Sequence, residues 1–256
     1  MPTETHRIPV SGGEQVALDW TPPRPGTVEA AVFIHGLGSH RRGDKALHFA
    51  ERFAGLGWGF LALDLRGHGA SDGTTRQLSL TRCLEDLTCA LAWLPRGIVP
   101  RLLIGSSMGA AVVAWQRLAH PDARGVSALI APSLAFPHRW AAELPPQELA
   151  AWQRTGVRTF RSAWIDLEIG WGLMEDAKSY DPARLARDHA TPTLILHGMQ
   201  DTAVDWHASV QFLEACKYPH LHLLLIKDGD HRLTEQRAYL FDAMAAWLRS
   251  RGLLPD

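Results

Sequence analysis

The stretch Arg101-Leu-Leu-Ile-Gly-Ser-Ser-Met-Gly109 decides how this chain folds. Arg101–Gly105 is a short apolar run that predicts a buried strand, and Met108–Leu118 has the periodicity of a helix. Gly-x-Ser-x-Gly between a strand and a helix is typical of a sharp turn that presents one serine hydroxyl at the end of a sheet. We therefore predict that Ser107 is a nucleophile.

Short β-like runs alternate with longer helical segments along the chain. This alternation predicts an α/β fold, with a mostly parallel central sheet and helices on both faces. An additional antiparallel edge strand is expected at Gln15–Trp20. The expected parallel strands are Ala30–His35, Gly59–Leu65, Arg101–Gly105, Val126–Ala131, Thr193–His197 and His222–Ile226, and the expected helices are Lys45–Leu56, Leu80–Leu94, Met108–Leu118, Trp206–Cys216 and Glu235–Arg249.

The alternation breaks between Pro132 and Pro192, where we find no strand-like run. We expect two or three short helices there, forming a lid over a site, because a long interruption of a regular domain is usually functional. The predicted organisation is one domain, with residues 1–132 and 192–256 as the α/β core and residues 133–191 as a small helical cap. Four tryptophans of the cap either line an apolar acyl or aryl pocket or serve only as packing: Trp140, Trp152, Trp164 and Trp171.

The composition excludes several classes of protein. With 46% apolar and 21% charged residues, the 256-residue chain has an ordinary globular composition. Its net charge of −1 offers no general attraction to nucleic acid or to an anionic membrane. No apolar run is long enough to span a bilayer, so we expect no stable membrane insertion. We interpret the arginine pair Arg41-Arg42 as part of a solvated surface.

Cysteine usage and the N-terminus bear on the compartment. Cys83, Cys89 and Cys216 form no Cys-x-x-Cys pair and cannot all be bridged within one chain, which predicts a reducing environment. The first residues carry neither a basic nor an apolar signal region, so we expect a cytoplasmic protein. Nothing near His220 and His222 completes a set of metal ligands, so no zinc site is predicted.

A candidate acid follows the expected strand Thr193–His197. Asp201 lies in the loop at the carboxyl end of that strand, where a buried carboxylate could fix the tautomer of a catalytic histidine. Asp205 is the alternative, but it precedes Trp206 at an expected helix start and resembles an N-cap residue. We therefore favour Asp201.

A candidate base follows the last expected strand. The run Leu223–Ile226 leads into Lys227-Asp-Gly-Asp-His231, and the final helix begins soon afterwards. A flexible loop at this place can deliver an imidazole to Ser107. Because the ordinary pKa of histidine is close to neutral, His231 could accept and then return a proton.

Two backbone N–H groups are candidate donors to an oxyanion. A tetrahedral oxyanion needs pre-aimed donors, and the helix that starts at Met108 presents a free N–H there. The strand within Val32–Gly38 runs into a glycine-containing loop, whose Leu37 N–H is the second candidate. We expect His35 to satisfy a buried hydrogen bond and not to act as a base.

The order Ser107, Asp201, His231 along the chain is that of α/β-hydrolase triads. The sequence resembles the α/β-hydrolase superfamily along nearly its whole length, including Asp64-Leu-Arg-Gly-His-Gly-Ala-Ser-Asp72. The resemblance implies an α/β-hydrolase fold. In that family this loop is mainly structural, so Asp64 and His68 are not candidate site residues.

A closer resemblance is to the small serine esterases and thioesterases that include the mitochondrial acyl-protein thioesterase. It implies hydrolysis of acyl esters or thioesters. The His35-Gly36 pair, in contrast, looks more like the lipase and esterase pattern. The motifs that carry the closer resemblance are Gly105-Ser-Ser-Met-Gly109, Leu196-His-Gly-Met-Gln-Asp201, Trp206-His-Ala-Ser209, Asp230-His-Arg232 and Leu144-Pro-Pro-Gln-Glu-Leu149.

The residues and the resemblance together predict a serine hydrolase that cleaves small-molecule carboxylic esters through an acyl-enzyme on Ser107, without a metal or cofactor. An acyl-protein or acyl-CoA-type thioesterase is one alternative. A carbon–carbon bond hydrolase is another, although in those enzymes Asn often stands where this chain has Ser106. The fold also occurs in ligand-binding receptors with negligible turnover. The sequence does not predict the oligomeric state.

Overall fold

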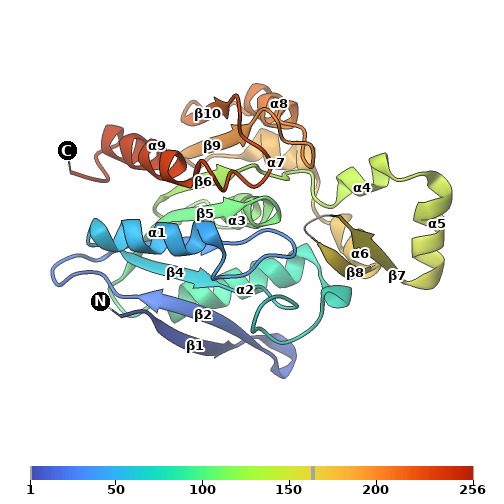
Figure 1. Ribbon diagram of the computed structural model, residues 1–256, viewed down its shortest axis with the longest axis horizontal. Helices are drawn as coiled ribbons and strands as arrows, with labels where there is room; N and C mark the ends of the chain where they lie inside the picture. Colours follow the sequence, from blue (N-terminus) through green and yellow to red (C-terminus); the bar gives the residue numbers. More distant parts are fainter. Residues whose placement is uncertain (1, 163–164, 256) are drawn as a thin grey trace.

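An eight-stranded sheet runs through the centre of the computed structural model, which describes residues 2–162 and 165–255 (Figure 1). Its strands are β1 (Glu4–Pro9), β2 (Gln15–Thr21), β3 (Glu29–Ile34), β4 (Gly59–Leu63), β5 (Val99–Ser106), β6 (Val126–Ile130), β9 (Thr193–Gly198) and β10 (Leu221–Ile226). The order across the sheet is β1-β2-β4-β3-β5-β6-β9-β10. The pairs β1–β2 and β2–β4 are antiparallel and all the others are parallel, which confirms the mostly parallel sheet.

All seven expected strands form, each within two residues of its expected ends. The expected place of one of them was wrong, because Gln15–Trp20 is not an edge. Strand β1 pairs along β2 and becomes the outer strand instead. The sequence of β1 is polar and mostly exposed, so it carries no apolar alternation that would have predicted it.

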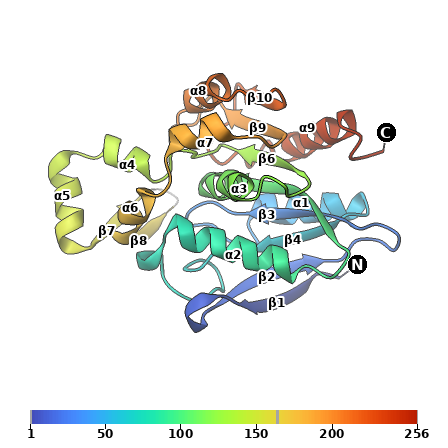
Figure 2. The ribbon, with the colours of Figure 1, turned by 180° about the vertical axis from the view of Figure 1, so that it is seen from behind.

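Helices cover both faces of the sheet, as expected. Helices α1 (Asp44–Gly55) and α9 (Arg237–Ser250) lie on one face and contact each other (Figure 1). The other face carries α2 (Leu80–Trp93), α3 (Met108–Ala119), α7 (Pro182–Asp188) and α8 (His207–Ala215), seen in front in Figure 2. Side chains of β3 alternate between the two layers, because Val32 and Ile34 join the α3 side and Ala31 and Phe33 the α1 side.

The segment between β6 and β9 differs from the all-helical insertion that we expected. It contains α4 (His138–Glu143), α5 (Pro146–Thr155), the antiparallel hairpin of β7 (Val157–Arg161) and β8 (Asp166–Gly170), and α6 (Gly172–Ala177), before α7. The expectation of no strand was wrong. Cross-strand pairing stabilises this short ribbon, while the charged side chains among its residues hid the apolar alternation.

The tryptophans of residues 133–191 that can be described pack against other side chains. Trp152 is 1% exposed and donates from Nε1 to the Ile169 carbonyl at 2.9 Å. Trp140 stacks on Phe160 with ring centroids 4.3 Å apart, and Trp171 packs edge-on against Trp152. Trp164 lies outside the described residues. Trp140 and Trp152 belong to the same apolar cluster as β3 and α3, so the core continues from the sheet into this segment.

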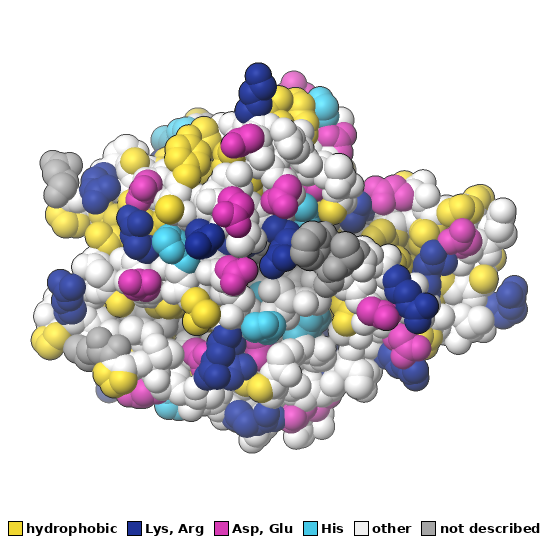
Figure 3. Space-filling view, in the orientation of Figure 1, with side chains coloured by type: hydrophobic (Ala, Val, Ile, Leu, Met, Phe, Trp, Pro, Cys, Tyr) yellow, Lys and Arg dark blue, Asp and Glu magenta, His cyan; other side chains and the backbone are white. Residues whose placement is uncertain are grey.

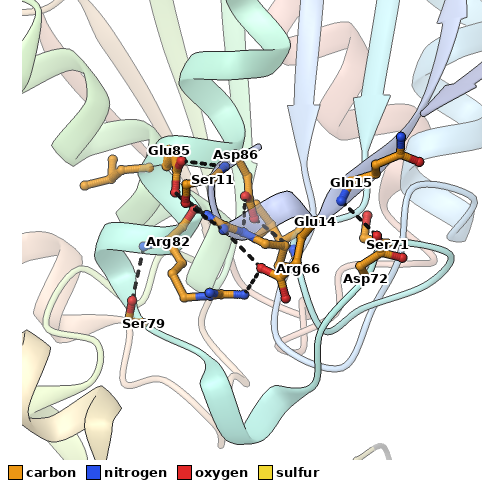
Figure 4. Close-up of polar contacts among 12 residues, drawn as sticks. Ser11, Glu14, Gln15, Arg66, Ser71, Asp72, Ser79, Arg82, Glu85 and Asp86 are labelled. Atoms are coloured by element: carbon orange, nitrogen blue, oxygen red, sulfur yellow. Dashed lines mark hydrogen bonds and ion pairs between the residues drawn. The ribbon is translucent and has the colours of Figure 1, made fainter. Parts of the chain in front are cut away.

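Buried ion pairs fix the loops that follow β4. Arg66 lies between Glu14 and the α2 residues Glu85 and Asp86 (Figure 4). Its Nε is 2.6 Å from Asp86 Oδ1, and its backbone N–H donates to Asp86 Oδ2 at 2.8 Å. Burial raises the pKa of Asp86 to about 6, although Arg66 acts in the opposite direction.

A second buried pair corrects the interpretation of Arg41 as solvated. Arg41 is 8% exposed, and its guanidinium bonds the fully buried carboxylate of Asp64. Asp64 also accepts the backbone N–H groups of Arg41 at 2.6 Å and of Ala70 at 2.8 Å. The expectation that Asp64 has a structural role agrees with these contacts.

A neutral histidine is buried beside the first residue of β9. His189 is 3% exposed, and its Nε2 donates to Thr193 Oγ1 at 3.0 Å, because that hydroxyl itself donates to the Thr191 carbonyl. Burial lowers the pKa of His189 to about 4, and the nearby charge of Arg117 adds to this. The folded protein therefore holds this imidazole neutral.

His189 should make the protein less stable in mild acid. The pKa of His189 is lower in the folded than in the unfolded chain. Its contribution to the free energy of unfolding is therefore complete above about pH 6.5 and is lost as the pH falls towards about 4. The free energy of unfolding of the wild type should fall between about pH 7 and pH 5. We expect that fall to be about 2 kcal/mol smaller in His189→Gln, which keeps a donor for Thr193. Urea unfolding at both pH values measures this, with exposed His220→Gln as control. An equal loss in both variants would contradict the assignment.

Candidate active site

Ser107 lies in a strained turn between β5 and α3. Its backbone has φ 54° and ψ −115°, a region that costs a residue with a side chain about 1–3 kcal/mol. Three hydrogen bonds hold it there. Its N–H donates to the Ile130 carbonyl at 2.9 Å, and its own carbonyl accepts from Ala110 at 3.0 Å and Ser133 at 3.2 Å. The fold thus fixes the direction of the Ser107 side chain before any ligand binds.

Glycines allow the backbones to approach around this serine. A Cβ atom at Gly105 would lie 2.4 Å from the Gly109 carbonyl oxygen, and one at Gly109 would lie 2.3 Å from the Ile34 carbonyl oxygen at the end of β3. A Cβ at Gly36 would lie 3.1 Å from the Cβ of Ser107, so the loop after β3 runs directly beside the serine. The two glycines of the Gly-x-Ser-x-Gly motif therefore lie where a side chain would not fit.

The structure brings Ser107, Asp201 and His231 together. Ser107 Oγ lies 3.0 Å from His231 Nε2, and His231 Nδ1 lies 2.7 Å from Asp201 Oδ2. The carboxylate assigns the proton to Nδ1, which leaves Nε2 to accept from the serine hydroxyl. The three side chains follow β5, β9 and β10, which are parallel strands of one sheet and so deliver them to the same edge.

Two further glycines bring the acid and base loops into contact, and the sequence analysis missed them. A Cβ at Gly198 would lie 2.2 Å from the Gly229 carbonyl oxygen, so any side chain there would push the loops apart. The His231 loop is shaped by Asp230, whose Oδ1 accepts the Leu233 N–H at 2.7 Å, and by the positive φ of Leu233 (48°). From α1, Lys45 donates to the Arg232 carbonyl.

Asp201 is held as a carboxylate by four N–H donors. Its side chain is fully buried. Oδ1 accepts the backbone N–H groups of Ala203 and Val204, both at 2.8 Å, and Oδ2 accepts from His231 and from His197 at 3.0 Å. Burial opposes ionisation, but these hydrogen bonds hold the pKa of Asp201 well below its usual range. The sequence analysis missed His197, because nothing separates it from an ordinary core histidine.

The rival carboxylate Asp205 has a different role. Its side chain is 70% exposed and accepts from the backbone N–H of His207 at 3.0 Å and from the ring Nδ1 of the same residue at 2.7 Å. The expected N-cap position was wrong by one residue, because α8 begins at His207 with Trp206 at its N-cap and Asp205 stands just before it.

The candidate oxyanion donors lie on either side of Ser107. Met108 begins α3, and Leu37 follows Gly36 in the loop beside the serine. Within the described part of the chain, no acceptor pairs with either backbone N–H. The Gly36 carbonyl accepts from His35 Nδ1 at 2.7 Å and from Ser39 at 3.1 Å. Because a peptide is planar, fixing that carbonyl also fixes the Leu37 N–H, which points the opposite way.

His35 is neutral and structural, as expected. Its Nε2 accepts the Leu65 N–H at 3.1 Å while Nδ1 bonds Gly36, which uses both ring nitrogens. Complete burial lowers the pKa of His35 to about 3, and the neighbouring His68 adds to this. Both nitrogens being engaged, this imidazole is not available as a base.

The hairpin β7–β8 lies against the candidate oxyanion loop, residues 36–38. A Cβ at Gly38 would lie 2.5 Å from Ile165 and 3.3 Å from Leu167, so two apolar side chains cover that loop. At its other end the hairpin is tied to the 3₁₀ turn at residues 75–77, because Arg76 pairs with Glu168 at 2.5 Å. In Figure 3, basic and acidic side chains are interspersed over the face of the molecule that Figure 1 shows.

The described residues form neither a metal-binding cluster nor a membrane-spanning helix. Across residues 2–162 and 165–255, no three His, Cys, Asp or Glu side chains gather in a way that could hold a metal ion. No helix in these ranges combines the length and the apolar character that crossing a membrane requires. Each of the three cysteines is a free thiol.

The α/β hydrolases have a strained serine between a parallel strand and a helix, with a histidine and a carboxylate supplied by later loops. This chain has the same arrangement and is an α/β hydrolase. Comparison with known families agrees with this assignment. The chain belongs to the family described as serine aminopeptidase, S33, whose match covers residues 26–190.

Individual relatives lie in the same class. Over 217 residues the chain is 28% identical to mouse palmitoyl-protein thioesterase ABHD10, a mitochondrial protein, covering 82% of this chain and 71% of the relative. Over 136 residues it is 32% identical to a monoacylglycerol lipase of Mycolicibacterium smegmatis, covering 50% of this chain and 46% of the lipase. A putative hydrolase from Agrobacterium vitis superimposes with a TM-score of 0.86, at 26% identity and 100% coverage of both chains.

The close packing at Gly109 predicts an intolerant position. We expect Gly109→Ala to lower the free energy of unfolding by about 3 kcal/mol, because the new methyl group would overlap the Ile34 carbonyl. Gly172→Ala in α6 is the matched control, since a methyl group there meets nothing within 4 Å and should be neutral or stabilising. Urea unfolding of both variants measures the difference. Equal stabilities would show that α3 can shift to make room.

Proposed function

We propose that this protein is an esterase that hydrolyses carboxylic esters through an acyl-enzyme on Ser107, with Asp201 and His231 as its catalytic partners. One observation carries the proposal. The same imidazole lies 3.0 Å from the Ser107 hydroxyl and 2.7 Å from the Asp201 carboxylate, which is the arrangement that acyl transfer by serine needs. The monoacylglycerol lipase relative supports ester chemistry.

In the proposed mechanism, His231 Nε2 takes the hydroxyl proton as Ser107 Oγ attacks the substrate carbonyl carbon. The N–H groups of Leu37 and Met108 stabilise the oxyanion, and Asp201 stabilises the imidazolium. Collapse of the tetrahedral intermediate breaks the ester bond, and His231 gives its proton to the leaving oxygen. A water molecule then repeats the sequence on the acyl-enzyme, and the carboxylic acid is released.

Thioesters of apolar acyl groups are the second candidate substrates. The mouse relative, a palmitoyl-protein thioesterase, supports them. The apolar side chains of Ile165 and Leu167 beside the oxyanion loop favour an apolar acyl group in either case. Residues 133–191 are our proposed cap over this site.

The free thiols support our prediction of a reducing compartment, for which the cytoplasm is our proposal. The mouse relative is a mitochondrial protein by name. The proposed partner is a small-molecule acyl ester or thioester.

The acyl and leaving-group preferences follow from one substrate series. We expect Ser107→Ala to lower kcat/KM at least about 10⁴-fold on esters with the fold intact, because the nucleophile is lost. The series contains acyl groups of increasing length, each as an ester and as a thioester, with an aminoacyl anilide to test peptidase activity. Preference for long thioesters would select the thioesterase. Tight binding of acyl ligands by the wild type without turnover would instead favour a receptor and contradict the proposal.

The pH dependence tests the roles of His231 and Asp201. We expect kcat/KM to rise with pH along one acid limb, because the base must be deprotonated while Asp201 is already ionised. Asp201→Asn should lower kcat/KM about 10⁴-fold and move the limb to lower pH, since the imidazolium loses its negative partner.

Asp205→Asn is the matched control for this experiment. It removes the rival carboxylate, which bonds only His207 among the described residues, and should leave both the rate and the limb unchanged. A flat profile for the wild type, or equal losses in the two Asn variants, would refute the assignment.

A further inference from the structure

A second imidazole bonds the proposed catalytic acid from the side away from the serine. His197, the fifth residue of β9, is fully buried, and its Nε2 lies 3.0 Å from Asp201 Oδ2, the oxygen that also accepts from His231. Its Nδ1 lies 2.7 Å from Ser209 Oγ on α8. Five side chains therefore form one line of hydrogen bonds, from Ser209 through His197, Asp201 and His231 to Ser107.

The partners assign the tautomer of His197. Its Nε2 faces two oxygens that can only accept, Asp201 Oδ2 and the Val204 carbonyl at 3.2 Å, so Nε2 carries a hydrogen. In the neutral ring Nδ1 then accepts the hydroxyl hydrogen of Ser209. This arrangement satisfies every polar atom of a side chain that has no contact with water.

We propose that His197, oriented by Ser209, is a positioning residue for the reaction, which acts through Asp201 and never touches the substrate. The inference rests on the proposed function. Asp201 has sites for about four hydrogen bonds, and each is occupied. The backbone donors of Ala203 and Val204 fix Oδ1, so His197 is the group that fixes Oδ2 in the direction of His231.

The shared oxygen also gives His197 an electrostatic effect. A donor to Oδ2 disperses part of the negative charge that His231 Nδ1 faces. Removing it would concentrate that charge, stabilise the His231 imidazolium and move the acid limb of the rate to higher pH. This direction is opposite to the one expected for Asp201→Asn, so the two effects can be told apart.

Other charged groups surround this line and stay unchanged in the test. Asp205 stands two residues before α8, the helix that carries Ser209. On the far side, Asp230 and Arg232 flank His231 in the chain, and Lys45 of α1 contacts their loop. Because each variant below alters only His197 or Ser209, a shift of the limb reports on their hydrogen bonds.

The test measures the rate at which Ser107 reacts with an alkyl fluorophosphonate as a function of pH. In this reaction the Oγ–P bond forms and the P–F bond breaks, with His231 accepting the serine proton. We expect His197→Leu to lower the rate up to about 100-fold, as small misplacements of catalytic groups do, and to move the acid limb up by about 0.5–1 unit. His197→Gln restores a donor at the Nε2 position and should recover most of both effects.

Two further measurements separate positioning from a loss of structure. Ser209→Ala leaves the imidazole in place and should move the limb in the same direction by less, which keeps the proposal testable where His197→Leu folds poorly. In an Asp201→Asn background, His197→Leu should have almost no effect on the rate, whereas a structural role would lower it by the same factor in both backgrounds.

The outcomes distinguish this inference from the proposed function. Failure of the reagent to label the wild type at a site removed by Ser107→Ala would overturn the proposed function. Labelling of the wild type together with an unmoved acid limb in His197→Leu and Ser209→Ala would overturn only the role of His197.

Discussion

The rest of the structure depends on the absence of side chains at two positions beside the β5–α3 turn. With a Cβ at Gly105 or Gly109, the first turn of α3 could not lie against β5 and the end of β3, because the methyl groups would overlap backbone atoms at 2.4 and 2.3 Å. That contact accompanies the positive φ of Ser107 and places the loop after β3 beside it. The strain at one residue is thus maintained by the packing of three elements.

The buried parallel strands were predictable because their continuous apolar runs leave few other interpretations. The missed elements depend on pairing and not on composition. Strand β1 and the hairpin β7–β8 are polar segments that become strands only because a neighbour completes their hydrogen bonds. Likewise, Arg41 looks like a surface residue until the fold brings Asp64 next to it.

The candidate site divides in the same way. Ser107, Asp201 and His231 were predictable because each occupies a distinctive place at the end of a strand, and parallel strands end at one edge. Their supports were not. Gly198, Gly229 and His197 act through contacts between loops, and a single sequence carries no signal for a contact between two loops.

Two buried carboxylates show what these supports achieve. Burial works against the charge of both Asp86 and Asp201, yet it raises the pKa of Asp86 to about 6, while that of Asp201 lies well below its usual range. Asp86 forms an ion pair with the guanidinium of Arg66 and accepts the backbone N–H of the same residue. Asp201 accepts four N–H groups, of which two come from the backbone of a tight turn and two from imidazoles. At Asp201 the hydrogen bonds and the neighbouring imidazole outweigh the cost of burial, whereas at Asp86 the contacts with Arg66 do not. Because the fold supplies these donors, Asp201 is ionised and oriented before a substrate arrives, and no binding energy is needed to arrange it.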